Sequence, residues 1–444
     1  MAVSAQRPSA NINQCRNGSS SSPTGCVTVG GATGWVTGNA GSSNSHWAEN
    51  QFLAYRALIS NMQIGSTGNT ITLGYDILKS GRHAIDYLGT YNATETTNNP
   101  CVGVSGGFCV AASPSSSYTV PVDTETVVNP SIINPNSGMQ LIQVPGEFTM
   151  WGGTITNVAY QPYGGGDERR ITVTFTANVS NPVLAWGGHV GWVGDWGVGN
   201  SAGGISGSPY HMRLIDINGS GGNMDLSLSA DAVIASGAVY IVKSVTSLSV
   251  DFPNESPQAF TFTATPNFGP TTFQLIDDDA GPGVDTQVGQ TITSFGPTNS
   301  ITVSEPAANM PVGWTLSDVN CVESGAQDST KSPSLGPATI IVQPNEVVIC
   351  TFYNTQLAPS AAGVEIRGRV MNQAGWPVSN VRVTLAGDDG TVRTALTNMF
   401  GYYVIDDVEV GRGYVLSAHS KLYNFPSRFL FLSDDLTEVN IIAQ

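Results

Sequence analysis

Charged residues are scarce in this chain of 444 residues. Asp, Glu, Lys and Arg together make up 11% of it, whereas soluble domains usually hold about a quarter. Lys and Arg number 17 against 33 Asp and Glu, which gives a formal net charge of −16. Phosphate backbones would repel such a chain, so we expect no nucleic-acid partner.

Long apolar runs are also missing. No run reaches the length that spans a membrane, and the first residues contain no apolar core of a signal peptide. We therefore expect no membrane insertion and interpret the chain as a mature or trimmed product. Neither a CxxC nor an HExxH motif occurs, which disfavours zinc. We expect no cofactor, with Ca²⁺ as an open alternative.

The cysteines are even in number and fall into neighbouring pairs: Cys15, Cys26, Cys101, Cys109, Cys321 and Cys350. Six cysteines allow about fifteen pairings, and the sequence alone cannot select one. Adjacent pairing is the hypothesis we favour, because each pair brackets a local segment or lies within one expected domain. Disulfides form in oxidising compartments, so we expect a secreted protein, extracellular or on a cell surface.

The fold class indicated is all-β. Gly is abundant, at 51 residues, and Ile171 to Ala177 alternates apolar and polar residues as a half-buried strand does. Further strands are expected at 70–78, 117–128 and 139–150, whereas 46–59 suits either a short helix or a strand. Residues 1–236 are thus expected to form a large, jelly-roll-like β-sandwich.

The rest of the chain is expected to form two smaller Ig-like or prealbumin-like sandwiches. One covers residues 237–356, a linker covers 357–363, and the other sandwich covers 364–444. Turn signals separate seven short strands in the first of these. They are expected at 239–245, 259–265, 271–277, 291–295, 300–306, 338–344 and 347–354.

Motifs in all three units resemble known families. Residues 364–444 resemble the carboxypeptidase regulatory-like, transthyretin-like fold through Gly368–Val370, Gly375–Val378, Val381–Val383, Thr397–Tyr403 and Val410–Tyr414. The middle unit resembles the collagen-adhesin B-type, prealbumin-like domains of bacterial surface proteins through Ile241–Lys243, Val303–Glu305, Pro311–Trp314 and Cys350–Asn354. The first unit resembles uncharacterised regions of bacterial secreted proteins through Gly81–Tyr87, Ala185–His189, Asp195–Gly197 and Gly207–His211. These resemblances imply a non-catalytic surface or fibre protein.

Lys243, Glu305 and Asn354 form the sharpest candidate site. The resemblance implies that the first-strand Lys and last-strand Asn lie side by side in the core and form an intramolecular isopeptide bond promoted by the carboxyl group. A desolvated Lys loses its proton and becomes a nucleophile, while a buried neutral carboxyl group can shuttle protons. The alternative is a solvated Lys243 and an Asn354 that makes turn hydrogen bonds.

Two other segments of the sequence offer weaker candidate sites. Asp277, Asp278, Asp279 and Asp285 form an acidic turn that could hold Ca²⁺. The spacing fails the EF-hand template, so a solvated turn is the interpretation we favour. Ser201 lies in a G-x-S-x-G match near Asp195, His189 and His211. A hydrolase elbow needs a strand before the Ser and a helix after it, and the flanking sequence predicts no helix here.

Surface chemistry suggests two further possibilities. Trp151, Trp186, Trp192 and Trp196 would stack on sugars if exposed, although Trp is usually buried. Glycosylation sequons occur at Asn17, Asn92, Asn178, Asn218 and Asn254.

The leading hypothesis is a non-enzymatic extracellular subunit of a bacterial, pilus-like fibre that polymerises head-to-tail by strand sharing or domain docking. The tail before Cys15 is the candidate donor strand. The rivals are a monomeric carbohydrate-binding or adhesive protein and, more remotely, a Ser201 hydrolase.

Overall fold

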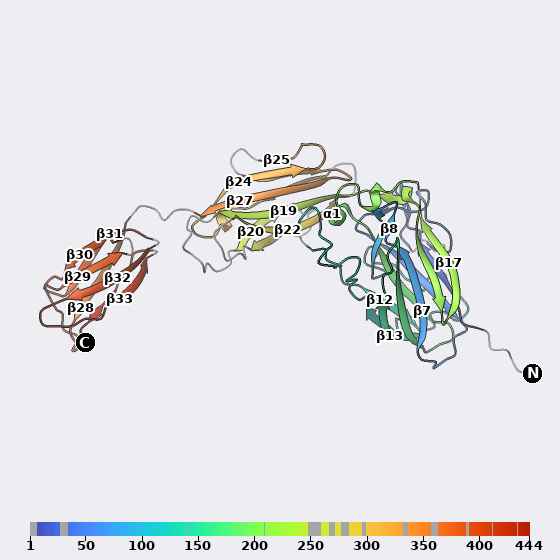
Figure 1. The fold of residues 1–444 in the computed structure, drawn as a ribbon, viewed down its shortest axis with the longest axis horizontal. Coiled ribbons are helices and arrows are strands. Elements are labelled where there is room, and N and C mark those ends of the chain that lie inside the picture. Colours follow the sequence, from blue (N-terminus) through green and yellow to red (C-terminus); the bar gives the residue numbers. More distant parts are fainter. Residues whose placement is uncertain are drawn as a thin grey trace, which may run out of the picture.

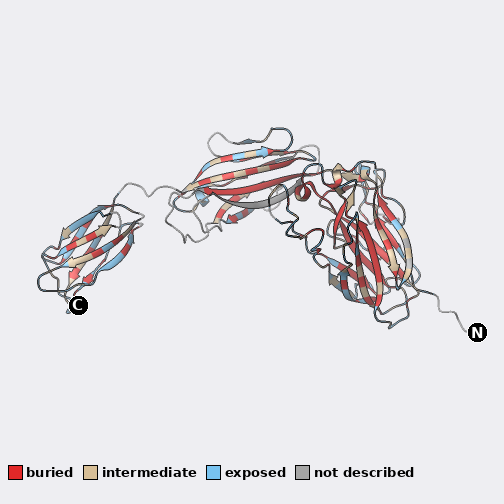
Figure 2. Cartoon of the chain, in the orientation of Figure 1, coloured by how far each residue is buried: buried red, intermediate tan, exposed pale blue. Residues whose placement is uncertain are grey.

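In the computed structural model nearly all regular secondary structure is β-strand, and the strands form three successive β-sandwiches (Figure 1). The structure describes residues 7–26, 34–138, 140–207, 209–246, 259–265, 271–276, 284–294, 299–331, 336–356, 363–387, 390–410, 412–432 and 434–444. Buried residues concentrate on the strands of the sandwiches, as the red segments in Figure 2 show. None of the helices in these ranges is both long and apolar enough to cross a membrane.

The N-terminal sandwich packs a seven-stranded sheet against a five-stranded one. The first sheet has the order β11 (Ser116–Thr119), β12 (Glu147–Trp151), β15 (Val183–Val190), β6 (Phe52–Ser60), β1 (Ser9–Cys15) and β4 (Trp35–Val36), with β10 (Ile85–Gly89) also paired to β15. The second has the order β13 (Gly153–Tyr160), β14 (Glu168–Ala177), β7 (Asn69–Asp76), β16 (Tyr210–Ile217) and β17 (Ser220–Leu228).

Local sequence explains most of these strands and also the places where the expectation was wrong. In β14 the odd residues from Arg169 to Ala177 are buried, as the period of two predicts. The ambiguous segment 46–59 supplies β6 rather than a helix. Only a short part of each expected strand at 117–128 and 139–150 is a strand, namely β11 and β12. An irregular coil joins these two strands.

The middle sandwich contains a four-stranded and a five-stranded sheet. The order of the first is β22 (Val284–Ser294), β19 (Gly237–Thr246), β27 (Val347–Gln356) and β24 (Trp314–Glu323). The order of the second is β21 (Thr272–Ile276), β20 (Ala259–Ala264), β23 (Asn299–Ser304), β26 (Ala338–Val342) and β25 (Thr330–Lys331). Phe260, Phe262 and Phe352 lie fully buried between the sheets.

The sequence did not predict two strands of this sandwich, the two-residue β25 and the longer β24. β24 carries Ser, Asp and Asn among its apolar residues, which weakens the alternation. It nevertheless pairs with β27 along its length, from Trp314 opposite Gln356 to Glu323 opposite Val348. Its buried residues include Trp314, Leu316 and Val319.

The C-terminal sandwich is the smallest. One sheet has the order β31 (Tyr402–Val408), β28 (Val364–Met371) and β34 (Ile441–Ile442). The other has the order β30 (Val392–Leu396), β29 (Arg382–Gly387), β32 (Arg412–His419) and β33 (Arg428–Leu432). Apolar residues of both sheets, among them Ile366, Val383 and Leu416, form a core of their own.

Three disulfides join Cys15 to Cys26, Cys101 to Cys109 and Cys321 to Cys350. The third links β24 to β27, where Cys321 and Cys350 are direct register partners with Cα atoms 4.0 Å apart. It closes a segment with a sequence separation of 29, against 8 for the second. Because a longer closed loop removes more entropy from the unfolded chain, the third disulfide is expected to stabilise most.

Replacing both Cys321 and Cys350 with Ala should lower the free energy of unfolding by about 3–4 kcal/mol. The Cys101→Ala, Cys109→Ala double variant is the matched control and should lose about 2.5 kcal/mol, because its loop is shorter. Urea titrations of both variants, followed by intrinsic fluorescence, provide the comparison. An equal or smaller loss for the Cys321, Cys350 pair would contradict this ranking.

Candidate functional site

The structure brings Lys243, Glu305 and Asn354 together in the core of the middle sandwich. Lys243 lies on β19 and Asn354 on β27, and these two strands run parallel as direct neighbours. Glu305 follows the last residue of β23 in the opposite sheet. Alternation explains the inward direction of both strand residues, since Lys243 shares the buried face with Ile241 and Val245, and Asn354 shares it with Phe352.

The carboxyl group of Glu305 contacts both partners. Its Oε2 lies 3.7 Å from Lys243 Nζ, and its Oε1 accepts a 2.7 Å hydrogen bond from Asn354 Nδ2. Lys243 and Asn354 are 1% and 0% exposed. The alternative of a solvated Lys243 is therefore wrong, since its ammonium group lies in the interior.

The Lys243 amine is buried among backbone oxygens, the Glu305 carboxyl group and an aromatic ring. Its Nζ donates to the backbone oxygen of Phe352 at 3.0 Å and lies 4.5 Å from the ring centre of Phe260. Burial raises the pKa of Glu305, and the opposing effects of Lys243 and Asn354 are smaller. A carboxyl group that stays protonated above its ordinary pKa can donate a proton to an amide and take one from an amine.

This arrangement suits amide formation between Lys243 and Asn354. The neutral amine would attack Cγ of Asn354, the Cγ–Nδ2 bond would break, and ammonia would leave with the proton that Glu305 relays. Met310 Sδ lies 2.9 Å from Asn354 Nδ2. A surface cavity of about 540 Å³, which Glu305, Met310 and Trp314 help to line, adjoins the site. The departing ammonia would therefore have a short route to solvent.

Residues 245–356 match the family model of a prealbumin-like fold domain. The match covers β27 and the Glu305 region and begins two residues after Lys243. It agrees with the two-sheet architecture of the middle sandwich. No curated protein matches the chain in sequence.

Solved structures give loose superpositions. The TIE protein of Bacillus anthracis is 11% identical over 90% of this chain and 56% of its own, with a TM-score of 0.24. The major pilin T-13 of Streptococcus pyogenes is 13% identical over 47% of this chain and 97% of its own, with a TM-score of 0.22. The pilus backbone protein RrgB of Streptococcus pneumoniae is 7% identical over 98% and 100%, with a TM-score of 0.17. The chain thus spans about half the length of the first of these proteins, and TM-scores this low do not establish a shared overall fold.

The environment of Ser201 does not resemble a hydrolase site. The residue is fully buried and precedes a three-residue 3₁₀ turn, η1 (Ala202–Gly204), rather than a helix. Both ring nitrogens of His189 are engaged elsewhere, Nδ1 by Asp86 at 2.6 Å and Nε2 by Asn50 at 3.0 Å. His211 pairs with Asp76. Among the described contacts, none supplies Ser201 with a histidine base.

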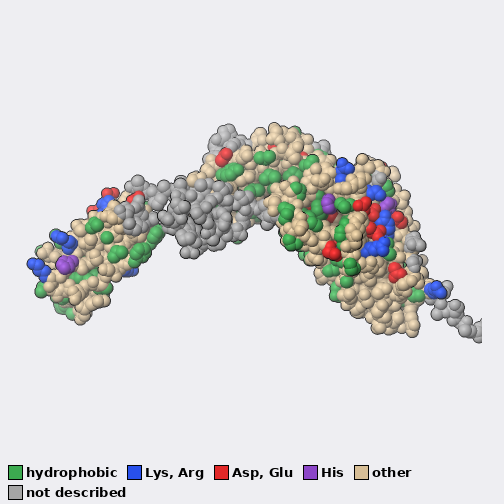
Figure 3. Space-filling model, viewed as in Figure 1, with side chains coloured by type: hydrophobic (Ala, Val, Ile, Leu, Met, Phe, Trp, Pro, Cys, Tyr) green, Lys and Arg blue, Asp and Glu red, His purple; other side chains and the backbone are tan. Residues whose placement is uncertain are grey.

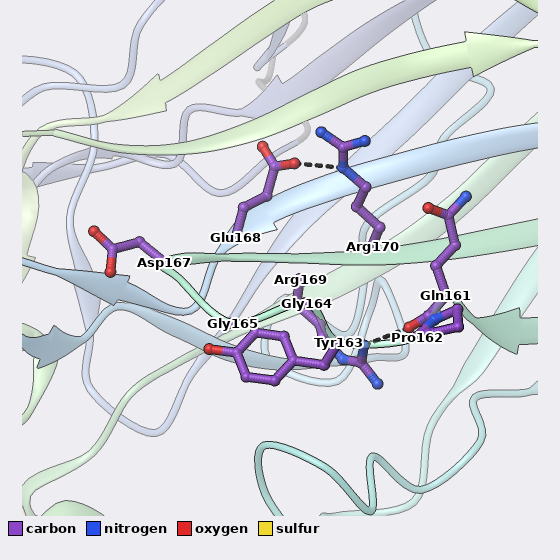
Figure 4. Close-up of a pocket in the computed structure, with 9 residues that line it drawn as sticks. All are labelled: Gln161, Pro162, Tyr163, Gly164, Gly165, Asp167, Glu168, Arg169 and Arg170. Carbon is purple, nitrogen blue, oxygen red and sulfur yellow. Dashed lines mark hydrogen bonds and ion pairs between the residues drawn. The ribbon is translucent and has the colours of Figure 1, made fainter.

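A charged hollow beside the β13–β14 turn escaped the sequence analysis (Figure 4). Arg169 helps to line the hollow, but its side chain is buried. Its guanidinium donates to Asp123 at 2.7 and 3.1 Å and to Glu125 at 2.7 Å. Arg170 pairs with Glu168 at 2.6 Å. The Arg169 pairs hold the coil between β11 and β12 on the sheet, whereas the Arg170–Glu168 pair lies within β14, so we assign both a structural role.

The structure gives no support to the sugar-stacking tryptophans and does not test the acidic turn. Trp151, Trp186, Trp192 and Trp196 are at most 8% exposed, so they cannot form a sugar-stacking row. Asp277, Asp278 and Asp279 lie outside the described residues, as does the side chain of Asp285, and no cluster of three metal-ligating side chains occurs in the part of the chain that is described. The Ca²⁺ hypothesis stays a prediction.

The glycosylation candidates differ in access. Asn17 is 2% exposed and its Nδ2 donates to the backbone oxygen of His46 at 2.8 Å, so the folded protein hides it. Asn178 and Asn218 are exposed, and Asn92 is half-buried. Asn254 lies outside the described residues.

The native chain should be lighter than its sequence mass by one ammonia once the disulfides are reduced. Glu305→Ala should restore the full mass, because the proton relay is lost, and Lys243→Arg should do so because Arg does not acylate. Glu305→Gln keeps the shape of the side chain but removes the carboxyl group that relays the proton, so we expect the full mass for this matched control too. Intact-mass spectrometry decides the matter, and a full-mass native chain would rule the bond out.

Proposed function

We propose that this chain is a non-enzymatic structural subunit of an extracellular fibre on a bacterial surface. The observation that carries the proposal is the placement of Lys243 and Asn354 on two parallel neighbouring strands of the middle sandwich. The chain enters this sandwich through β19 and leaves it through β27. A pull on the two ends therefore loads the β19–β27 pair in shear along its length.

An isopeptide bond at this position would shorten the path of force. Tension that enters β19 would reach Lys243, cross to Asn354 and leave at the end of β27. The 110 residues between Lys243 and Asn354 would then carry no tension. Such a bond suits a subunit that carries tension, because the crosslinked strands cannot be pulled apart.

The N-terminal sandwich is anchored where this path begins. Tyr240 on β19 donates its hydroxyl to the backbone oxygen of Gly194 in α1 (Val193–Trp196), and Asn134 Nδ2 donates to the same hydroxyl at 3.0 Å. Trp192 and Val193 pack against Tyr240 in a shared apolar cluster. Tension applied to the first sandwich would thus reach β19 through a packed contact.

A buried carboxylate reinforces this joint. Glu49 is 0% exposed and accepts backbone hydrogen bonds from Gly203 at 2.6 Å, Ser236 at 3.2 Å and Val193 at 3.3 Å. Ser236 directly precedes β19. The carboxylate therefore ties the α1–η1 segment to the entry of the middle sandwich.

Among the two modes of assembly, we favour docking of sandwiches over donation of the N-terminal tail. Residues 9–15 already form β1 in their own sheet, where Ser9 to Gln14 pair with β6. Cys15 at the end of β1 is also bonded to Cys26. Exchange of this strand would have to break six residues of pairing first.

The purified chain should assemble into fibres whose repeat is one subunit, as seen by negative-stain electron microscopy across a concentration series. Deletion of residues 1–8, which precede β1, should leave them intact. A single monomeric species at every concentration, with or without bound glycan, would contradict the proposal and favour the rival of a monomeric adhesive module.

A further inference from the structure

The free end of the C-terminal sandwich exposes an unusual number of large apolar side chains. Trp376 is 69% exposed, Met399 75%, Phe400 60% and Leu422 85%. They belong to three loops, namely β28–β29, β30–β31 and β32–β33. Patches of this kind on soluble proteins usually mark an interaction site.

Hydrogen bonds and one β-bridge place the three loops at one end of the sandwich. Arg369 Nε donates to Phe400 O at 2.9 Å, and Met371 forms a bridge with Pro377 in the Trp376 loop. The third loop joins them through the chain terminus, because Ala443 N donates to Met371 O and Gln444 N donates to Asn424 O. We call Trp376, Met399, Phe400 and Leu422 the apolar tip.

The charge at this end is opposite to that of the chain. No Asp or Glu occurs in residues 369–387, 390–405, 410–433 or 439–444. Arg369, Arg382, Lys421 and Arg428 lie on the strand ends and loops next to the apolar tip. Acidic residues such as Glu365 and Asp435 lie at the end of the sandwich opposite the apolar tip. Figure 3 shows basic side chains at the free end of this sandwich. A positive tip on a chain of net charge −16 is suited to an acidic partner.

A surface of matching chemistry occurs on the N-terminal sandwich. Residues 83–168 contain seven Asp or Glu and no Lys or Arg. Asp86 and Asp123 are buried, and Glu125 and Glu168 pair with Arg169 and Arg170. Glu147 at the start of β12 is therefore the acid that gives the coil between β11 and β12 its exposed negative charge. The coil between β11 and β12 in this stretch exposes Val122 at 51%, Ile142 at 77% and Val144 at 47%, next to the exposed Glu147. The coil is held together by hydrogen bonds from Asp123 N to Gln143 Oε1 and from Val120 N to Gly146 O. We call Val122, Ile142, Val144 and Glu147 the acidic coil face.

We propose that the apolar tip of one copy docks on the acidic coil face of the next, an inference that rests on the proposed fibre function. The two surfaces are apolar at the centre, opposite in charge, and located on the first and last sandwiches. A contact between two different surfaces of identical chains is heterologous, and it generates an open polymer when the rotation does not close. It would leave the β19–β27 pair in the line of tension between successive copies.

The test reverses charge at the tip of the full-length chain. Arg382 and Lys421 are exposed, and Arg382→Glu, Lys421→Glu should raise the concentration needed for fibre formation at least tenfold, measured by light scattering and electron microscopy. Adding Glu147→Lys should recover part of this loss. Arg7→Glu, Lys79→Glu is the matched control, because it changes net charge equally and should assemble as the parent does. Higher salt should also weaken assembly of the parent chain.

The apolar part of the contact has its own pair of variants. Trp376→Ser, Phe400→Ser should abolish fibres, whereas Phe429→Ser, Phe431→Ser should not, although these residues are 69% and 51% exposed on the outer face of β33 of the same sandwich. Fibres that form unchanged in Arg382→Glu, Lys421→Glu and in Trp376→Ser, Phe400→Ser would overturn this contact. The proposed fibre function would still stand. If the tip variants assemble normally but no longer bind anionic lipid vesicles, the apolar tip belongs to a lipid surface and the contact between copies is likewise overturned. A parent chain that never assembles would remove the fibre function together with the contact.

Discussion

The contact of one buried carboxyl group with Lys243 and Asn354 is the interaction on which the account of this protein depends. Burying an ammonium group and a carboxyl group costs free energy unless they are paired or neutral. The middle sandwich nevertheless places both in its core, with Lys243 and Asn354 on the strands that begin and end it and Glu305 facing them from the opposite sheet. Conversion of Lys243 and Asn354 to an amide removes the charge and the cost together, and it joins the two strands through which the chain enters and leaves.

The architecture on either side is consistent with that role. The N-terminal sandwich is packed on β19 through Tyr240 and tied to it through Glu49, so it is not held by a loose tether. The C-terminal sandwich follows β27 and presents at its far end a basic, apolar tip. In the proposed fibre each sandwich would have a distinct part, with the middle one transmitting tension and the outer two making contacts.

The sequence predicted those features that depend on local pattern. Alternation is sufficient to identify β14, β20 and β23, and the same alternation places Lys243 beside Ile241 on an inner face. The resemblance to a prealbumin-like family singled out Glu305 and Asn354, which no spacing rule would have connected. The domain limits and the bond itself stay predictions.

Long-range contacts account for what was missed. β24 is a strand because it pairs with β27, although Ser317, Asp318 and Asn320 weaken its pattern. The coil after β11 is held by the buried pair of Arg169 and Asp123, which lie 46 residues apart. Asn17 looks like a loop sequon, yet contacts with His46 bury it. Such contacts depend on the assembled fold, so the local sequence carries no signal for them.

Pulling single molecules by their termini under reducing conditions tests the central claim most directly. If Lys243 and Asn354 are joined, the 110 residues between them never extend, and only the first and last sandwiches unfold as the force rises. The Lys243→Arg chain should show an additional event that releases about 370 Å of contour, at roughly 3.4 Å per residue. The same additional event in the native chain would contradict the account.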